Sequence, residues 1–358
     1  MERADLVNMP EPHDRDAHML GRLEESRSAL MQAVERGFDH WIVTFSGGKD
    51  STAMAVLSLE TGLELGSQVR RIDIVYADTL LEIPSIQQFA SFFLESIASD
   101  NRLIDLPLFT HTVRPAAESS FWVLLLGRGY PPPHQRFRWC TRRLKIEPAE
   151  VALRRFTQPG RTAILTGVRF GESKARDARL DATCSRGGEC GQGVWLQHSQ
   201  RLQATYMAPI VDWEECDVWD YLTLVAPTLG YKTGHLEDVY NGHDTRFGCW
   251  VCTVVSQEKA LTRTVEKPEW EHLRPLLEFR AHLWRSTRDP ATRLEVDGRP
   301  GRLNLMTRQR VLSELLEVQR QVGTELVSDP ELRMIRELWK EEFGPRTDGD
   351  GPNPAFGS

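Results

Sequence analysis

A glycine-containing loop between an apolar strand and a helix limits the possible folds of this 358-residue chain more than any other feature. Residues 41–45 are apolar and β-branched, which is typical of a buried strand. The loop Ser46–Ser51 follows, and Thr52–Leu65 predicts a helix that ends at Gly66. Glycines let a backbone approach an anion, and the first N–H groups of a helix attract it. The sequence therefore predicts a phosphate-binding loop here.

Each side chain of this loop has a role in that prediction. Lys49 adds a positive charge, and Asp50 either caps the helix or helps to hold a magnesium ion. The alternative is an ordinary Gly-Gly turn before a helix. The residues that we expect to bind the nucleotide in this loop are Ser46, Gly47, Gly48, Lys49, Asp50 and Ser51.

Strands alternate with helices along the next part of the chain. Further strands are predicted at Ile72–Ala77, Leu108–Val113, Ala163–Val168 and Tyr206–Val211, and helices at Leu20–Phe38 and Pro84–Ala98. This alternation predicts an α/β fold with a doubly wound, mostly parallel sheet. Ligands of such sheets bind beyond the carboxyl ends of the strands, so the loops after Phe45, Ala77 and Val168 should open onto one crevice.

Two of these loops carry further candidate residues. Asp78 and Thr79 follow the second strand, where an acidic side chain often contacts a nucleotide or a metal, although a helix-capping aspartate is the alternative. The loop after the fourth strand contains arginines whose guanidinium groups suit phosphates, although it could also be a solvated charged loop. Its candidate residues are Gly167, Arg169, Glu172 and Arg176.

The three loops together resemble one superfamily. SGGKDS is similar to the PP-loop of the ATP pyrophosphatases, which cleave ATP between the α and β phosphates. DTLLE and GVRFGESKAR resemble loops of the phosphoadenylylsulfate (PAPS) reductase branch of that superfamily. The resemblance implies an adenine nucleotide alpha-hydrolase-like fold that binds ATP and Mg²⁺. The catalytic residues that it implies are Lys49, Asp50, Arg169 and Arg176.

The character of the chain changes after about residue 245. Helices are predicted at Pro268–Trp284, Thr307–Val322 and Asp329–Phe343. The predicted organisation is a flexible N-terminus at 1–18, a PP-loop domain at 19–245, a mainly helical, cysteine-containing region at 246–343 and a flexible tail at 344–358. The net charge of -7 excludes a globally basic DNA-coating protein. A polar N-terminus and the lack of a long apolar run predict a cytoplasmic protein without a membrane segment.

Six cysteines are too few for a disulfide framework, but their spacing suits a metal or redox site. Cys249 and Cys252 form a CxxC pair that could chelate one metal, and Cys140 lies far upstream. The stretch around Cys140 resembles assimilatory adenylylsulfate reductases, which implies a [4Fe–4S] cluster. Only one cysteine stands where that family has a pair, so a fourth ligand comes from elsewhere or is absent; the candidates are Cys190, in a glycine-rich context, and alternatively Cys184. Zinc and a metal-free disulfide exchange pair are the alternatives, and a core thiol is expected at Cys216.

A basic stretch surrounds Cys140. Between Gly127 and Ile146 there are six basic residues and no acidic one, with aromatic residues interleaved, which suits phosphate contact and base stacking. A solvated charged face is the alternative interpretation. The residues that we expect to contact nucleic acid are Arg136, Arg138, Arg142, Arg143 and Lys145.

The strings RFRWCTRRLKIEP, GVRFGES and RFGCWVCTVV resemble the DndC and SspD class of DNA phosphorothioation sulfurtransferases. That resemblance implies an enzyme that activates a DNA backbone phosphate with ATP and incorporates sulfur, as part of a defence system resembling restriction and modification. It also implies DNA, a cysteine desulfurase and other phosphorothioation-system subunits as partners.

Three alternatives remain at this point. A PAPS or adenylylsulfate reductase-like oxidoreductase would carry a cysteine in an ECGxH motif near its C-terminus, and no cysteine follows Cys252. A tRNA thiolation enzyme would share the PP-loop but bind tRNA. A non-catalytic nucleotide-binding subunit is disfavoured by the intact SGGKDS string.

Overall fold

The computed structural model describes residues 12–171, 177–178, 196–240, 247–286 and 288–344. The chain forms two compact units, each built from separate stretches of sequence. Unit 1 consists of Met1–Asp78, Glu82–Arg114 and Pro148–Phe247. Unit 2 consists of Thr79–Leu81, Pro115–Glu147 and Gly248–Ser358. The sequence analysis expected one boundary near residue 245, whereas residues 115–147 belong with the C-terminal region.

Unit 1 contains a six-stranded sheet with the order β3-β2-β1-β4-β6-β5. Its strands are β1 (His40–Phe45), β2 (Arg71–Ala77), β3 (Leu108–Val113), β4 (Thr162–Leu165), β5 (Leu196–Ser199) and β6 (Ala204–Met207). All neighbouring strands pair in parallel except β5, which runs antiparallel to β6 at one edge. This confirms the predicted α/β fold with a mostly parallel sheet.

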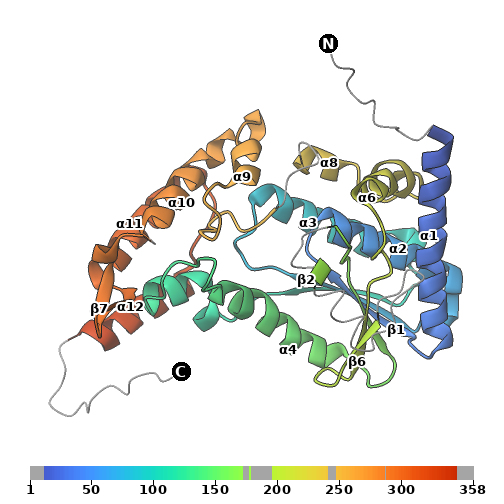
Figure 1. Ribbon diagram of the computed structural model, residues 1–358, viewed down its shortest axis with the longest axis horizontal. Coiled ribbons are helices and arrows are strands. Elements are labelled where there is room, and N and C mark those ends of the chain that lie inside the picture. The colour runs from blue at the N-terminus through green and yellow to red at the C-terminus, as the bar shows by residue number, and fades with distance from the viewer. Residues whose placement is uncertain (1–11, 172–176, 179–195, 241–246, 287, 345–358) are drawn as a thin grey trace. The chain divides into compact units, whose positions relative to one another are not determined.

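Helices cover both faces of this sheet (Figure 1). The helices of unit 1 are α1 (Pro12–Glu35), α2 (Lys49–Leu65), α3 (Pro84–Ala98), α4 (Glu147–Phe156), α6 (Glu215–Asp220), α7 (Ala226–Thr228) and α8 (His235–Tyr240), with shorter turns at Gly66–Gln68, Asn101–Leu103 and Tyr221–Val225. Trp41 and Val43 of β1 face the core that contains α1, α2 and α3, whereas Ile42 packs with Leu153 of α4 on the other face. Because both faces are covered, β1 is apolar along its whole length.

Several elements of unit 1 differ from the expectations, among them β6, which spans Ala204–Met207 rather than Tyr206–Val211, and α2, which begins at Lys49 rather than Thr52. Helix α1 begins at Pro12 rather than Leu20, because proline is favoured in a first helical turn, and His18 of this helix pairs with Asp217 at 3.3 Å. Residues 12–18 are therefore helical, and residues 1–11 lie outside the described residues. Strand β4 ends at Leu165, before the predicted Val168, and the edge strand β5 was not predicted.

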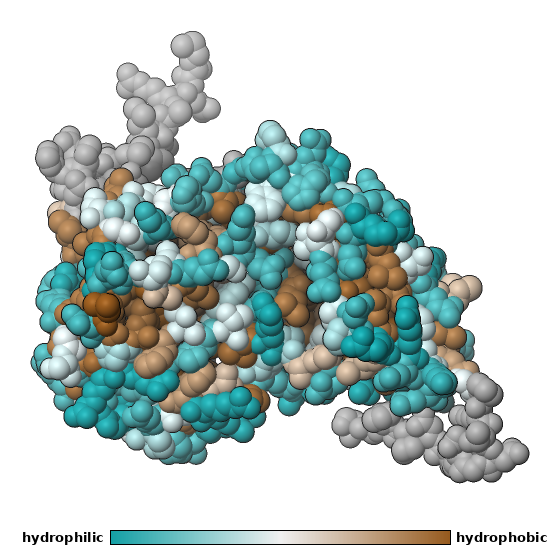
Figure 2. Space-filling view, turned by 180° about the vertical axis from the view of Figure 1, so that it is seen from behind, coloured by the Kyte–Doolittle hydropathy of each residue, from teal (hydrophilic) through white to brown (hydrophobic). Residues whose placement is uncertain are grey.

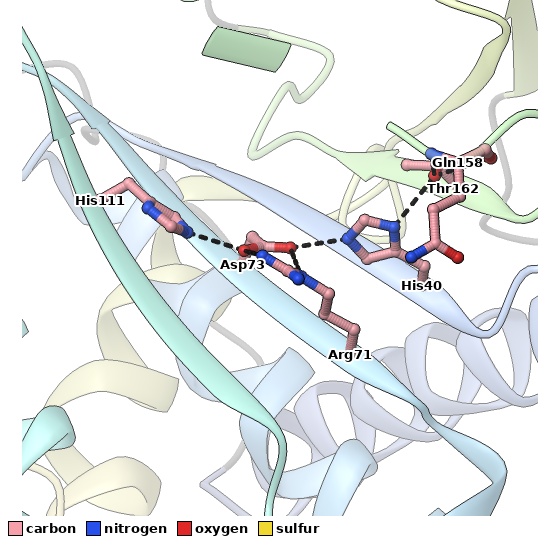
Figure 3. Close-up of polar contacts among 6 residues, drawn as sticks. All are labelled: His40, Arg71, Asp73, His111, Gln158 and Thr162. Atoms are coloured by element: carbon pink, nitrogen blue, oxygen red, sulfur yellow. Dashed lines mark hydrogen bonds and ion pairs between the residues drawn. The ribbon is translucent and has the colours of Figure 1, made fainter. Parts of the chain in front are cut away.

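A buried carboxylate joins the three strands β1, β2 and β3 (Figure 3). Asp73 has no exposed side-chain surface, and its Oδ2 lies 2.6 Å from Nε2 of His40. Its Oδ1 lies 2.7 Å from Nε2 of His111, and Arg71 donates from Nε and Nη2 at 2.7 and 2.9 Å. On the far side of His40, Nδ1 lies 3.1 Å from Oγ1 of Thr162. This Asp73 cluster fills the acceptor sites of the carboxylate with donors.

Unit 2 contains the predicted C-terminal helices and a hairpin. Its elements are α9 (Lys259–Thr264), α10 (Arg274–Ser286), α11 (Leu305–Val322), α12 (Asp329–Phe343), β7 (Arg293–Val296) and β8 (Arg299–Leu303), with shorter turns at Ala117–Ser119, Val123–Gly127, Thr141–Ile146, Pro268–Leu273 and Pro290–Thr292. Asp297 and Gly298 both have positive φ, which suits a tight hairpin turn between β7 and β8. The helical C-terminal region is therefore confirmed, whereas the hairpin was not predicted.

The segment 115–147 is bound to the C-terminal helices within unit 2. The indole of Trp122 donates to the carbonyl of Leu326 at 2.6 Å, and the indole of Trp339 donates to the carbonyl of Leu126 at 2.7 Å. The guanidinium of Arg308, which has no exposed surface, donates to the carbonyl of Gly127 at 3.0 Å and to the Glu342 carboxylate at 2.7 Å. Because of these contacts, residues 115–147 belong to unit 2 and not to unit 1, which contains the sheet.

In the described residues, no helix combines the length and the apolar character that crossing a bilayer requires. On the face drawn in Figure 2, hydrophobic residues are interspersed with hydrophilic ones.

Candidate functional site

The loop Ser46–Gly48 lies at the carboxyl end of β1, next to the point where the strand order reverses. From β1 the chain continues outward through β2 and β3 on one side, and β4 then pairs with the other side of β1. In open α/β sheets this switch point separates the loops that follow the two neighbouring strands and leaves room for a ligand. The loops after β1 and β4 therefore border the expected binding position.

The backbone of the loop is arranged so that its N–H groups remain available. Gly47 has a φ of 75°, which few other residues adopt, and Gly48 precedes α2 as its N-cap. The hydroxyl of Ser51 accepts from the N–H of Ser46 at 3.1 Å and donates to the carbonyl of Gly48 at 2.9 Å, which holds the turn closed. Within the described part of the chain, the N–H groups of Gly47 and Gly48 have no partner. They lie at the N-terminus of the 17-residue α2, where the helix dipole favours an anion.

Charged residues from the loops after β1 and β4 lie together around Asp50. Its Oδ1 lies 2.5 Å from Nε of Arg169, and its Oδ2 lies 3.0 Å from Nζ of Lys49. Arg169 is only 3 % exposed and also donates to the carbonyl of Trp213 at 2.9 Å. Lys49 lies 3.5 Å from the Glu215 carboxylate as well. The structure thus brings Lys49, Asp50 and Arg169 together, with Arg169 holding the Asp50 carboxylate, whereas Glu172 and Arg176 lie outside the described residues.

Gly167 allows this close approach of the two loops. A Cβ atom at this position would lie 2.6 Å from the carbonyl oxygen of Asp50 and 2.9 Å from the backbone nitrogen of Ser51. These are backbone atoms at the start of α2, so the clash cannot be relieved by a side-chain rotation.

Replacing Gly167 with alanine is therefore expected to displace the start of α2 and to weaken nucleotide binding at least tenfold, because a 1 Å misplacement of a binding group is costly. Titration calorimetry with ATP would measure this loss. Gly171→Ala is the matched control, because no atom lies within 4 Å of its Cβ position, although its positive φ adds local strain. Equal ATP affinity in Gly167→Ala and in the wild type would contradict the prediction.

Tyr240, which the sequence analysis did not single out, also contacts the loop. Its hydroxyl accepts a hydrogen bond from the N–H of Lys49 at 3.0 Å, and its side chain is 6 % exposed. The two residues are 191 positions apart, and no motif surrounds Tyr240.

The predicted pair that follows β2 is divided between the two units. Asp78 belongs to unit 1, is 2 % exposed and accepts a hydrogen bond from Nε of Arg114 at 2.9 Å. Thr79 belongs to unit 2, where its hydroxyl lies 3.9 Å from Sγ of Cys249. Asp78 thus lies at the predicted edge of the sheet, and Thr79 lies beside the CxxC pair.

The three cysteines Cys140, Cys249 and Cys252 all belong to unit 2. The CxxC pair forms a tight turn in which the N–H of Cys252 donates to the carbonyl of Cys249 at 3.0 Å. Arg280 fastens this turn by donating from Nε to the carbonyl of Cys252 at 3.0 Å. Burial raises the pKa of the Cys140 thiol, and the neighbouring Cys252 raises it further. Both shifts favour the protonated thiol in the absence of a bound group.

The predicted metal site requires several ligand side chains close together. Nowhere in the described ranges do three or more His, Cys, Asp or Glu side chains gather closely enough to hold a metal ion. The candidate fourth ligands, Cys184 and Cys190, lie outside the described residues. The described residues alone therefore do not fit a cluster. Cys216 is half-buried with Sγ 3.7 Å from the Glu214 carboxylate, so the expectation of a core thiol is wrong.

The predicted nucleic-acid residues form an exposed group in unit 2. Arg142 and Arg143 pair with the Glu147 carboxylate at 2.9 and 3.1 Å. Burial alone would raise the pKa of Glu147, but the hydrogen bonds and positive charges of Arg143 and Arg142 outweigh it, so the pKa is lowered. Exposed ion pairs of this kind are weak, so a phosphate could replace the carboxylate. The whole group, all of it exposed, is Arg136, Arg138, Arg142, Arg143 and Lys145.

Comparisons with known proteins are consistent with this fold. Residues 40–255 match the phosphoadenosine phosphosulfate reductase domain, a range that runs from β1 through the CxxC pair. Among solved structures, the chain is similar to the phosphoadenylyl-sulfate (PAPS) reductase from Candida auris in a phosphate complex. The identity is 16 % and the TM-score 0.37, over 68 % of this chain and 98 % of that chain. No curated protein matches the chain.

Proposed function

The chain belongs to the phosphoadenosine phosphosulfate reductase domain family. Within this family, we propose that it is an ATP-dependent sulfurtransferase that modifies the DNA backbone. In this proposal, the loop Ser46–Ser51 binds the phosphates of ATP, and the enzyme releases AMP and pyrophosphate while a sulfur atom replaces a non-bridging oxygen of DNA. The reaction would take place in a reducing cytoplasm, with a cysteine desulfurase as sulfur donor and other subunits of a phosphorothioation system as partners.

The observation that carries the proposal is the set of donors at the start of α2. The N–H groups of Gly47 and Gly48, which have no partner among the described residues, precede Lys49 at the positive end of a long helix. Such an arrangement stabilises the charge that develops on a departing pyrophosphate. Because both oxygens of Asp50 already pair with Arg169 and Lys49, a magnesium ion would be bound chiefly by the phosphates themselves.

The proposed chemistry has two displacements at phosphorus, followed by one at sulfur. A non-bridging oxygen of the DNA phosphodiester attacks the α-phosphorus of ATP, and the bond to pyrophosphate breaks. A donor persulfide then attacks the activated DNA phosphorus through its terminal sulfur, and AMP leaves with the oxygen. A second thiol finally cleaves the remaining sulfur–sulfur bond and is oxidised to a disulfide, so that one sulfur remains on phosphorus.

The exposed arginines of unit 2 support DNA as the substrate. Arg136 and Arg138 are exposed and belong to a stretch without acidic residues, so they suit contacts with a phosphate backbone. Such contacts carry no sequence information by themselves. We therefore expect a salt-sensitive affinity for DNA and assign the choice of DNA sequence to the partner subunits.

Mass spectrometry of nuclease-digested DNA tests this function. DNA from cells that express the chain with its system partners should contain phosphorothioate-linked dinucleotides, and DNA from cells that express the Lys49→Ala variant should not. If the two samples contain the same dinucleotides, the proposed function is wrong.

The second candidate is a PAPS reductase activity, which the family match favours equally. In that case the purified chain, supplied with PAPS and reduced thioredoxin, should release sulfite. Sulfite release without any DNA modification would replace the first proposal with the second.

A further inference from the structure

Tyr240 occupies an unusual position for a buried tyrosine. Its hydroxyl oxygen lies 3.0 Å from the backbone nitrogen of Lys49, and the position of a Cβ on Gly48 would lie 3.3 Å from the same oxygen. The hydroxyl therefore lies directly at the phosphate-binding loop of unit 1. Its ring contacts the rings of Trp219 and Phe247 edge-on, with centroids 5.0 and 4.6 Å apart. These contacts fix the ring, so the hydroxyl cannot leave the loop unless buried aromatic side chains separate.

The hydrogen-bonding capacity of this hydroxyl is only partly used. A phenol can accept a hydrogen bond and also donate one. Oη of Tyr240 accepts from the N–H of Lys49, but among the described residues no acceptor receives its own hydrogen. Burial raises the pKa of Tyr240, and the nearby Asp50 and Glu215 carboxylates raise it further against the opposing hydrogen bond from Lys49. The hydroxyl therefore keeps its hydrogen at neutral pH and remains a donor.

The neighbouring groups indicate what kind of acceptor is missing. Nζ of Lys49 lies 5.9 Å from the centre of the Tyr240 ring, and the free N–H groups of Gly47 and Gly48 belong to the same loop. The two carboxylates nearby, Asp50 and Glu215, already pair with Arg169 and Lys49. The remaining groups are donors or cations, so they favour an anion with several acceptor oxygens. A phosphate chain satisfies them, and hydrogen bonds to its charged oxygens are about twice as strong as neutral ones.

We propose that Tyr240 is a phosphate-binding residue, whose hydroxyl donates a hydrogen bond to a phosphate oxygen of the nucleotide at the Ser46–Ser51 loop. This inference rests on the proposed nucleotide binding at that loop. When the nucleotide binds, a phosphate oxygen takes over the N–H of Lys49, because it is a stronger acceptor than a neutral phenol. The Tyr240 hydroxyl then turns its hydrogen toward that phosphate.

The test removes only the hydroxyl. Tyr240→Phe keeps the ring packing, and titration calorimetry would measure the affinities for inorganic pyrophosphate, with magnesium present, and for adenosine. We expect the affinity for pyrophosphate to fall about 10- to 150-fold, the effect of one hydrogen bond to a charged group, and the affinity for adenosine to stay unchanged. Tyr231→Phe is the matched control, because Tyr231 is 4 % exposed and packs against Arg102, 4.7 Å from its ring centre. Thermal melting of both variants checks that they fold.

The outcomes separate this inference from the proposed function. A wild-type chain that binds neither pyrophosphate nor ATP would overturn both. If the wild type and Tyr240→Phe bind pyrophosphate with the same affinity, only the proposed role of Tyr240 is overturned. Tighter binding by Tyr240→Phe would show that the hydroxyl blocks the site, and an equal loss in Tyr231→Phe or for adenosine would show a general structural effect. Each of these results contradicts the proposal, whereas a loss confined to pyrophosphate and Tyr240→Phe supports it.

Discussion

Replacing Lys49 with alanine is expected to reduce the rate of pyrophosphate release by about 100- to 1,000-fold, the usual effect of removing one preorganised group that stabilises developing charge. The ammonium of Lys49 is only 12 % exposed and lies 3.0 Å from the Asp50 carboxylate, so it is already held at the loop before a nucleotide binds. Because Arg169 also pairs with Asp50, the loop should keep its shape without Lys49. The loss should therefore appear mainly in the turnover rate.

A coupled assay of pyrophosphate release, run with saturating ATP, measures this effect. Lys232→Ala is a suitable control, because Lys232 is an exposed lysine of the same unit and has no contact with the loop among the described residues. Turnover of Lys49→Ala within about threefold of the wild type would contradict both the charge-stabilising role of Lys49 and the proposed binding of phosphate at this loop.

Replacing Asp73 with asparagine is expected to lower the free energy of unfolding by about 3–5 kcal/mol, the usual cost of removing one partner from a buried ion pair. Asp73 is fully buried and accepts hydrogen bonds from His40, Arg71 and His111, which come from three different strands. An asparagine keeps one acceptor oxygen and replaces the other with an NH₂ group, so the donors that face the replaced oxygen would lose their acceptor. Urea unfolding would measure the loss, with the exposed Asp105→Asn as control. A difference below about 1 kcal/mol would show that the carboxylate charge is not needed.

The same carboxylate predicts how stability depends on pH. Burial alone would raise the pKa of Asp73, but the hydrogen bonds from His40, Arg71 and His111 outweigh it and hold the pKa well below its usual range. A depressed pKa in the folded state means that the stabilisation is complete above the unfolded value of about 3.9 and is lost as the pH falls below it. The stability difference between the wild type and Asp73→Asn should therefore shrink from pH 5 to pH 3. A difference that stays constant over this range would assign the stabilisation to packing.

Much of the sheet of unit 1 could be predicted from local patterns. The predicted ranges Pro84–Ala98 and Leu108–Val113 agree with α3 and β3 to the residue, because a proline begins the helix and a run rich in aromatic and β-branched residues forms the strand. The Ser46–Ser51 loop was also found at the predicted place after β1. These features depend on residues that are neighbours in the chain, which is the information that a single sequence contains.

Features that depend on distant contacts were not predictable in the same way. Tyr240 belongs to a short, mostly polar helix, and only the fold brings it to Lys49. The sequence Arg71-Ile72-Asp73 predicts only the start of a strand. The partners of Asp73 on the adjacent strands lie 33 and 38 positions away, so no local pattern reveals them. Likewise, no composition change marks residue 115, because the segment 115–147 joins unit 2 through contacts with helices at the other end of the chain.

Unit 2 is built from stretches that lie far apart in the sequence, which affects how the chain folds while it is translated. The carbonyl of Leu126, in an apolar segment, accepts a hydrogen bond from Trp339, which is synthesised 213 positions later. At roughly 5–20 residues per second, this delay is about 10–40 s. Until then Phe121, Trp122 and their neighbours, which end up buried, lack the part of their cover that the last helices of unit 2 supply. We therefore expect Phe121–Leu126 to be the segment that chaperones hold during translation, and a chain stopped before α12 to be prone to aggregation.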